Sequence, residues 1–209
     1  MKKYLDKLKR NIRINKNLFV FLLVIVLVAV ASGTIFANIL NQSDKSLVKE
    51  YLNNFLENAK TGNFNYNISL ANTFIFTLGS AIIIWILGIS VIGFIFIFAF
   101  LFLKAFIIGF SLGSIIINFH FKGILFSLGY IIPHHIINIM IYILLCSYAL
   151  IVSYKIINSL IKRKTLDFKQ ILGKYLFILI FSLIILFLTS LYEVYIVPKV
   201  MNFLTSILK

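Results

Sequence analysis

The sequence predicts an all-α integral membrane protein with about five transmembrane helices and short amphipathic helices at the membrane interface. Hydrophobic residues make up 61% of the chain and charged residues only 12%, a balance outside the range of soluble domains. The second observation is an apolar stretch, residues 85–118, in which Lys104 is the single charge. A transmembrane helix needs about 20 consecutive apolar residues, so this stretch is suited to lipid and not to a soluble core.

The first apolar segment, residues 18–40, follows a strongly basic segment, residues 1–17, in which Asp6 is the one acidic residue. Basic flanks stay on the cytoplasmic side of a membrane, so we expect residues 1–17 in the cytoplasm. The small residues at 29–32 also fit the cleavage site of a signal peptide. The apolar character continues to residue 40, however, which favours a retained transmembrane anchor.

Residues 41–70 differ from their neighbours because acidic and basic side chains balance there. That contrast with the basic segments indicates the extracytoplasmic side. Apolar residues recur within this segment at intervals of three and four, which predicts a short amphipathic helix. Such a helix either lies on the outer leaflet or binds another protein, and the candidate partner-binding residues are Leu47, Tyr51, Leu52 and Phe55.

Residues 71–154 are almost continuously apolar and predict a three-helix membrane core. The basic segment 155–174 that follows is expected in the cytoplasm. Because the chain passes from outside to inside between these limits, the number of crossings is odd, and three fit the length. We expect an inner break near Lys104, unless that lysine is buried with a partner, and an outer break at 118–123. A re-entrant or broken helix is the alternative.

Residues 175–197 form the last predicted span, which Pro198 is expected to close, because proline lacks the N–H that a continuing helix needs. Residues 198–209 then form an extracytoplasmic tail with the pattern of an interfacial helix. The scheme therefore has five spans, with the N-terminus inside and the C-terminus outside.

Small residues recur along the long apolar stretch. Ala105, Gly109 and Gly113 are four apart and share one helix face, and Gly88 and Gly93 precede them. Small residues let transmembrane helices approach closely. The pattern therefore predicts helix packing at these five positions, with the stretch as the packing centre of the protein.

A group of polar residues lies at membrane depth: Pro133, His134, His135 and Asn138. His134 and Asn138 are one helical turn apart and share a face, and a proline inside a span kinks its helix. Buried polar groups in a membrane are costly unless they are paired. Two interpretations remain. The group is either a functional site, which acts as a hinge, a partner-binding site or a proton site, or a structural cluster of hydrogen bonds between helices.

The sequence contains no convincing catalytic, cofactor-binding or metal-binding set. The three histidines and Cys146 have unrelated spacings, which do not match a metal site. The pattern from Gly109 to Gly113, with Ser111 between, matches a nucleophile elbow, but that elbow needs a strand-to-helix turn. The basic residues flank apolar spans and do not indicate nucleic-acid binding. We therefore expect a protein that is not an enzyme and needs no cofactor.

The order of these segments, with the stretch WILGISVIGFIFIFAFLFLKAFIIGFSLG and the following IIPHH, resembles the stage II sporulation protein M family over nearly the whole chain. Members of the wider family have a sequence similar to Pro-His-Gly-x-x-Glu in the helix after that stretch. Pro133 and His134 fit this pattern, whereas His135 replaces the glycine and Asn138 replaces the glutamate.

The resemblance implies a multipass cell-membrane protein of endospore-forming bacteria that acts in engulfment of the forespore, at the sporulation septum and the mother-cell engulfing membrane. It also implies two partners that degrade peptidoglycan, the stage II sporulation proteins D and P, which the membrane protein anchors and localises. The alternative is a membrane transporter or permease-like subunit. Lys104, His134, Asn138 and Glu193 would then supply its polar pathway.

Overall fold

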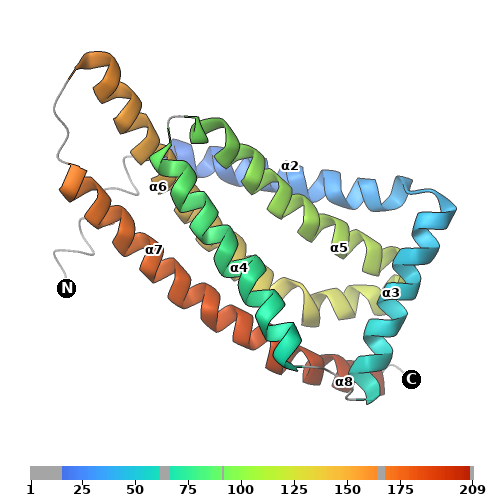
Figure 1. Ribbon diagram of the computed structural model, residues 1–209. Helices are drawn as coiled ribbons and strands as arrows, with labels where there is room; N and C mark the ends of the chain where they lie inside the picture. Colours follow the sequence, from blue (N-terminus) through green and yellow to red (C-terminus); the bar gives the residue numbers. More distant parts are fainter. Residues whose placement is uncertain (1–15, 62–65, 91, 164–167, 208–209) are drawn as a thin grey trace.

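The computed structural model describes residues 16–61, 66–90, 92–163 and 168–207, and these residues are almost entirely helical (Figure 1). The elements in chain order are α2 (Lys16–Ile39), α3 (Gln42–Thr61), α4 (Tyr66–Ile89), α5 (Gly93–Tyr130), α6 (Ile132–Lys162), α7 (Phe168–Leu191), the π-helix η1 (Tyr192–Ile196) and α8 (Val197–Ile207). Five segments, which begin with α2, α4, α5, α6 and α7, are long and apolar enough to cross a membrane. The predicted fold class is confirmed.

The chain runs back and forth between two ends of an elongated bundle (Figure 1). We call one the α3 end, because α3, the reversal of the chain within α5 and α8 lie there. The other is the basic end, where α2 begins, α4 turns into α5, and α6 leads to α7. The expected basic N-terminal segment falls mostly on residues 1–15, which lie outside the described residues.

Helix α6 is the packing centre of the bundle. It contacts α2, α4, α5 and α7, and it has the largest share of buried residues among the five membrane-spanning segments. Helix α5, which contains most of the stretch 85–118 predicted as the centre, also has extensive contacts, with α2, α3, α4, α6 and α8. Within that stretch α5 packs mainly along α2, and its remaining surface is apolar because a lipid-facing surface must be. Hydrophobicity therefore does not distinguish buried helices from lipid-facing ones in a membrane protein.

Helix α4 ends at Ile89 and α5 begins at Gly93, so the expected break near Lys104 is wrong. Lys104 lies within the continuous helix α5. At the turn, the Ser90 N–H donates to the Leu87 carbonyl at 3.1 Å. A side chain at Gly93 would overlap the Leu87 backbone. Glycine is needed there because the chain returns so closely on itself.

The chain reverses again at His120, within the segment 118–123 where the outer break is expected. His120 has φ 49° and ψ −124°, which is not helical. Gly123 then lies so close to Ile115 and Ile116 that a Cβ atom would be 2.9 Å from Ile116 Cα. The helix is interrupted once more at Ile131, two residues before Pro133, which lacks the N–H that would continue the helical hydrogen bonds.

Two further boundaries differ from the sequence expectation. Most of the segment 155–174 is helical, because α6 continues to Lys162 and α7 begins at Phe168. Pro198 does not close the last span, because it lies in the first turn of α8, where no N–H is required. Just before it, the Val197 N–H donates to the Tyr192 carbonyl, five residues back, so a π-helical turn joins α7 to α8.

Candidate functional site

The small residues of α5 pack against a matching row of small residues on α2. Gly109 lies directly on the Val30 backbone, and Gly33 lies on the Phe106 and Phe110 backbone, so side chains at either glycine would overlap main-chain atoms. Thr34 Oγ1 adds an interhelical hydrogen bond to the Gly109 carbonyl at 3.1 Å. The face of α5 that carries Gly109, which the sequence predicts as a packing surface, is therefore covered by α2 of the same chain.

The other predicted packing residues lie at two different places. Ala105 is completely buried on the same side of α5. Gly88 lies against Ala149 of α6 and Tyr175 of α7, and a Cβ atom there would be 2.8 Å from Ala149 Cα. The Tyr175 hydroxyl donates to the Trp85 carbonyl at 3.0 Å and so joins α7 to α4. Sequence reasoning missed Gly33 and Thr34, although Ala29, Gly33 and Ala37 have the same four-residue spacing as the α5 glycines.

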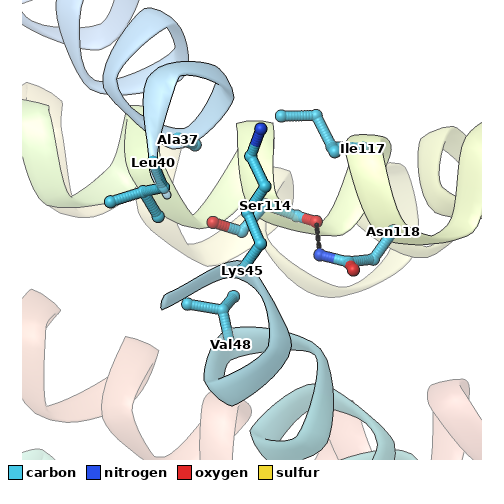
Figure 2. Close-up of a pocket in the computed structure, with 7 residues that line it drawn as sticks. All are labelled: Ala37, Leu40, Lys45, Val48, Ser114, Ile117 and Asn118. Carbon is cyan, nitrogen blue, oxygen red and sulfur yellow. Dashed lines mark hydrogen bonds between the residues drawn. The ribbon is translucent and has the colours of Figure 1, made fainter. Parts of the chain in front are cut away.

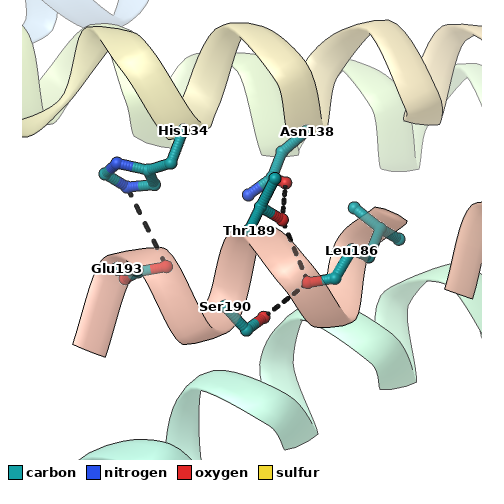
Figure 3. A network of polar contacts seen from close by, with 6 residues as sticks. All are labelled: His134, Asn138, Leu186, Thr189, Ser190 and Glu193. Carbon is teal, nitrogen blue, oxygen red and sulfur yellow. Dashed lines mark hydrogen bonds and ion pairs between the residues drawn. The ribbon is translucent and has the colours of Figure 1, made fainter. Parts of the chain in front are cut away.

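The polar residues His134 and Asn138 face α7 and η1 (Figure 3). Both side chains are buried. The Thr189 hydroxyl oxygen lies 2.6 Å from Asn138 Oδ1 and 2.9 Å from the Leu186 carbonyl. His134 Nε2 lies 3.9 Å from Glu193 Oε2. We call His134, Asn138, Thr189 and Glu193 the α6–α7 polar cluster.

Glu193 was not singled out from the sequence as a partner of His134, because it lies 59 positions later on another helix. The π-helical turn η1 carries this carboxylate near the histidine. Asn138, which stands where the wider family's pattern has glutamate, instead meets a hydroxyl. The neighbouring His135 has its ring centroid 4.2 Å from that of His134.

The geometry of the α6–α7 polar cluster suits interhelical bonding. Hydrogen bonds between transmembrane helices contribute about 0.6 to 2 kcal/mol each, and a polar side chain left unpaired in lipid would cost more. A protonated histidine and a carboxylate 3.9 Å apart can also form an ion pair. Among the described residues, no group of three or more His, Cys, Asp or Glu side chains could hold a metal ion.

A second polar group joins α4, α5 and α6 around Lys104. Lys104 Nζ donates to the Phe76 carbonyl at 3.2 Å and lies 5.8 Å from the centre of the Phe100 ring and 5.9 Å from that of Tyr142. The Tyr142 hydroxyl donates to the Thr77 carbonyl at 3.0 Å. The main-chain oxygens of Phe76 and Thr77, in one turn of α4, thus accept hydrogen bonds from α5 and α6.

The four candidate partner-binding residues of α3 divide into two pairs. Leu52 and Phe55 pack against a hydrophobic cluster that includes Phe126 of α5 and Met201 of α8, so they cover the α3 end of the bundle. Leu47 and Tyr51 are 64% and 74% exposed. The amphipathic stripe therefore does not act as one surface, since half of it is used inside the molecule.

A small cavity lies where the end of α2 and the start of α3 meet α5 (Figure 2). It is lined by Ala37, Leu40, Lys45, Val48, Ser114, Ile117 and Asn118. Asn118 Nδ2 donates to the Ser114 carbonyl at 2.8 Å. The free volume is about 10 Å³, which is at the lower limit for a single water molecule.

Comparison with known proteins adds one finding to this geometry. The family model described as stage II sporulation protein M matches residues 18–198. The matched range begins in the first turn of α2 and ends in the first turn of α8, so it covers most of each of the five membrane-spanning segments. No curated protein and no solved structure matches the chain.

Proposed function

Because this chain belongs to the stage II sporulation protein M family, we propose that it is a membrane scaffold that anchors and localises septal peptidoglycan hydrolases during engulfment of the forespore. Family membership together with the five apolar segments makes it a sporulation membrane protein. The proposed partners are the stage II sporulation proteins D and P. The proposed place of action is the sporulation septum and the mother-cell engulfing membrane.

The observation that carries the scaffold role is how the polar side chains of the spans are used. His134, Asn138 and Lys104 all contact groups on other helices of the same chain. Such contacts fix the relative position of helices and make the bundle a rigid support. No observation among the described residues favours the alternative, a transporter or permease-like subunit.

The α3 end supplies a surface for extracytoplasmic partners in this proposal. Helix α3 runs across the end of the bundle (Figure 1) and is held there by its contacts with α5 and α8. Its exposed residues Leu47 and Tyr51 lie beside polar side chains such as Glu50. One face of α3 is fixed to the bundle and the other is exposed. A partner can therefore bind the exposed face without α3 having to become ordered, which lowers the entropic cost of association.

Deletion of the gene in the native sporulating host tests the scaffold role. Fluorescent fusions of the two hydrolases should lose their septal position, and septal wall thinning should stop, while reintroduction of the wild-type gene restores both. A deletion strain that completes engulfment with its hydrolases correctly placed would contradict the proposal.

The proposal also states that the protein has no catalytic activity of its own. Purified protein in detergent should release no soluble fragments from peptidoglycan, with one of the hydrolases as the positive control. Release of fragments by the purified protein alone would make it an enzyme.

A further inference from the structure

Lys104 carries its charge near the middle of the membrane. It lies eleven residues after Gly93, where α5 begins at the basic end, and a helix rises by about 1.5 Å per residue, so the distance along the axis is about 16 Å. The hydrocarbon core is about 30 Å thick. A lysine side chain extends about 6 Å and can reach lipid phosphates only from a position near a helix end. At this depth Lys104 does not reach them.

The charge of Lys104 is only partly compensated within the chain. Its contacts are a main-chain carbonyl and two aromatic rings, and among the described residues no carboxylate lies within ion-pair distance of it. A charged lysine at the centre of a span is costly to insert into lipid unless it is paired. The side chain is half-buried, so part of it lies on the outer surface of the bundle, open to a partner.

Neither this chain nor a second copy of it supplies the missing carboxylate. Of the six acidic residues, only Glu193 lies in a membrane-spanning segment. Glu193 already lies 3.9 Å from His134, and among the described residues it makes no ion pair with Lys104. The compensating group therefore belongs to another molecule.

The surface beside Lys104 can accept another helix. Lys104 Nζ bonds to the carbonyl of Phe76 on α4, and Gly79 follows three residues later. A side chain at Gly79 would meet nothing within 4 Å, so this glycine faces open space and is not part of the internal packing. A partner that enters lipid at this depth must be helical, because only a helix satisfies its own backbone there. Small residues are where transmembrane helices approach most closely.

We propose that Lys104 is a docking point for a transmembrane helix of another protein, and that this helix carries an Asp or Glu at mid-span which pairs with the Lys104 ammonium group. The partner helix packs on the face of α4 and α5 that contains Gly79. This inference deepens the proposed scaffold function, because it names the chemistry by which the membrane part of a partner is recognised.

A synthetic single-span peptide tests this pairing without any hydrolase. The peptide is an oligo-leucine helix with one central Asp and a terminal acceptor dye, and matched peptides carry Asn or Leu at the central position. The full-length protein is reconstituted in phosphatidylcholine vesicles, and energy transfer from Trp85, the one tryptophan of the chain, reports binding. The Asp peptide should bind about tenfold more tightly than the Leu peptide, a difference of about 1.4 kcal/mol.

Variants at position 104 show whether the lysine causes the preference. Lys104→Met should remove the preference for the Asp peptide, Lys104→Arg should keep it, and Lys104→Glu should transfer it to a peptide with a central Lys. Helix content by circular dichroism and Trp85 emission verify that each variant is folded. Ile107→Met is the matched control, because Ile107 is exposed on the same helix one turn away.

Three results would overturn the inference. The first is equal binding of the Asp peptide to the wild type and to folded Lys104→Met. The second is equal binding of the Asn and Asp peptides, which would indicate a hydrogen bond without charge pairing. The third is loss of the preference when phosphatidylglycerol is added, which would identify a lipid phosphate as the ligand. The peptide contains no hydrolase, so failure here is separate from failure of the deletion experiment.

Discussion

The glycines Gly33 and Gly109 determine how closely α2 and α5 approach each other. Each lies against the main chain of the opposite helix, so the two backbones are in direct contact and a threonine hydroxyl can bond across them. Lipid removes the hydrophobic drive for helices to associate, and close van der Waals packing takes its place. The contact therefore depends on the lack of a side chain at two positions.

We expect Gly109→Leu to lower the amount of folded protein, because the leucine would overlap the Val30 backbone. Forcing extra carbon atoms into a packed site costs about 1–3 kcal/mol or more. The measurement is protein level in membranes together with thermal stability in detergent. Ile107→Leu is the control, because Ile107 is 57% exposed on the same helix. Equal levels and stability of the two variants would show that the α2–α5 contact does not hold the bundle.

A double-mutant cycle measures the bond between Asn138 and Thr189. Asn138→Ala combined with Thr189→Val should show a coupling energy of about 0.6–1.7 kcal/mol, because the two side chains meet at 2.6 Å. Unfolding in mixed micelles supplies the free energies. The matched cycle of Asn138→Ala with Ser182→Ala should show no coupling, since Ser182 Oγ has no hydrogen-bond partner within the described part of the chain. Equal coupling in both cycles would count against the bond.

His134→Gln separates a structural role from proton chemistry in the α6–α7 polar cluster. We expect sporulation and membrane levels to remain normal, because the glutamine amide can donate toward Glu193, which faces His134. Spore counts and immunoblots of membrane fractions are the measurements. If the variant accumulates normally but sporulation fails, the histidine acts through its proton and the structural assignment is wrong.

At the scale of the element, α3 shows why an amphipathic pattern does not reveal what its apolar face meets. The stripe predicted a helix, and the helix is present at Gln42–Thr61. The sequence could not show that Leu52 and Phe55 meet α5 and α8, because those contacts are about 70 to 150 residues distant in the chain. Their existence depends on the reversal at His120, which lies in the predicted break at 118–123, and on the π-helical turn before Pro198, which has no clear signal in the sequence.

The two sides of α3 should respond differently to substitution. Phe55→Ser should lower the thermal stability of the protein, because it removes an aromatic side chain from the α3 end of the bundle, and loss of a large buried side chain costs about 3–5 kcal/mol when burial is complete. Tyr51→Ser should leave stability unchanged, since Tyr51 is 74% exposed. In cells it should weaken hydrolase recruitment. A stable Phe55→Ser protein would show that α3 does not depend on this packing.

For the whole molecule, the sequence predicts the number of membrane-spanning segments correctly but places several of their first and last residues wrongly. Length and apolar content determine how many helices cross a membrane, so the count of five agrees with the structure. The lone charge Lys104 predicts a turn inside α5, whereas the structure has the turn between α4 and α5, because Lys104 is accommodated by contacts with α4 and α6. Gly88 and Gly93 flank the true turn, but glycine also occurs in helix packing, and its spacing alone does not separate the two uses.

Single cysteines in a Cys146→Ala background test the orientation of the bundle. Asn54 on α3 and Lys199 on α8 should react with an impermeant thiol reagent in intact cells, whereas Arg163 should react only after lysis. All three side chains are exposed, and the orientation follows from the basic residues near α6 and α7. Labelling at position 163 in intact cells with protection at position 54 would reverse the assignment.

The hydrophobic cluster at the α3 end combines Leu52 with Val197 and Met201. Leu52 is far from these two residues in the chain, and this distance in sequence has a consequence for biosynthesis. Chains are made and inserted from the N-terminus onward, so α3 is translocated long before its packing partner α8 exists. During that interval the part of the apolar side of α3 that packs against α8 has no partner, although α5 can already cover the rest. The cluster closes only after the chain beyond Met201 has left the ribosome and crossed the membrane. With α3 outside the membrane, as the charge distribution predicts, a ribosome that stalls within α7 is expected to leave part of this apolar surface open to proteases that remove unfinished proteins.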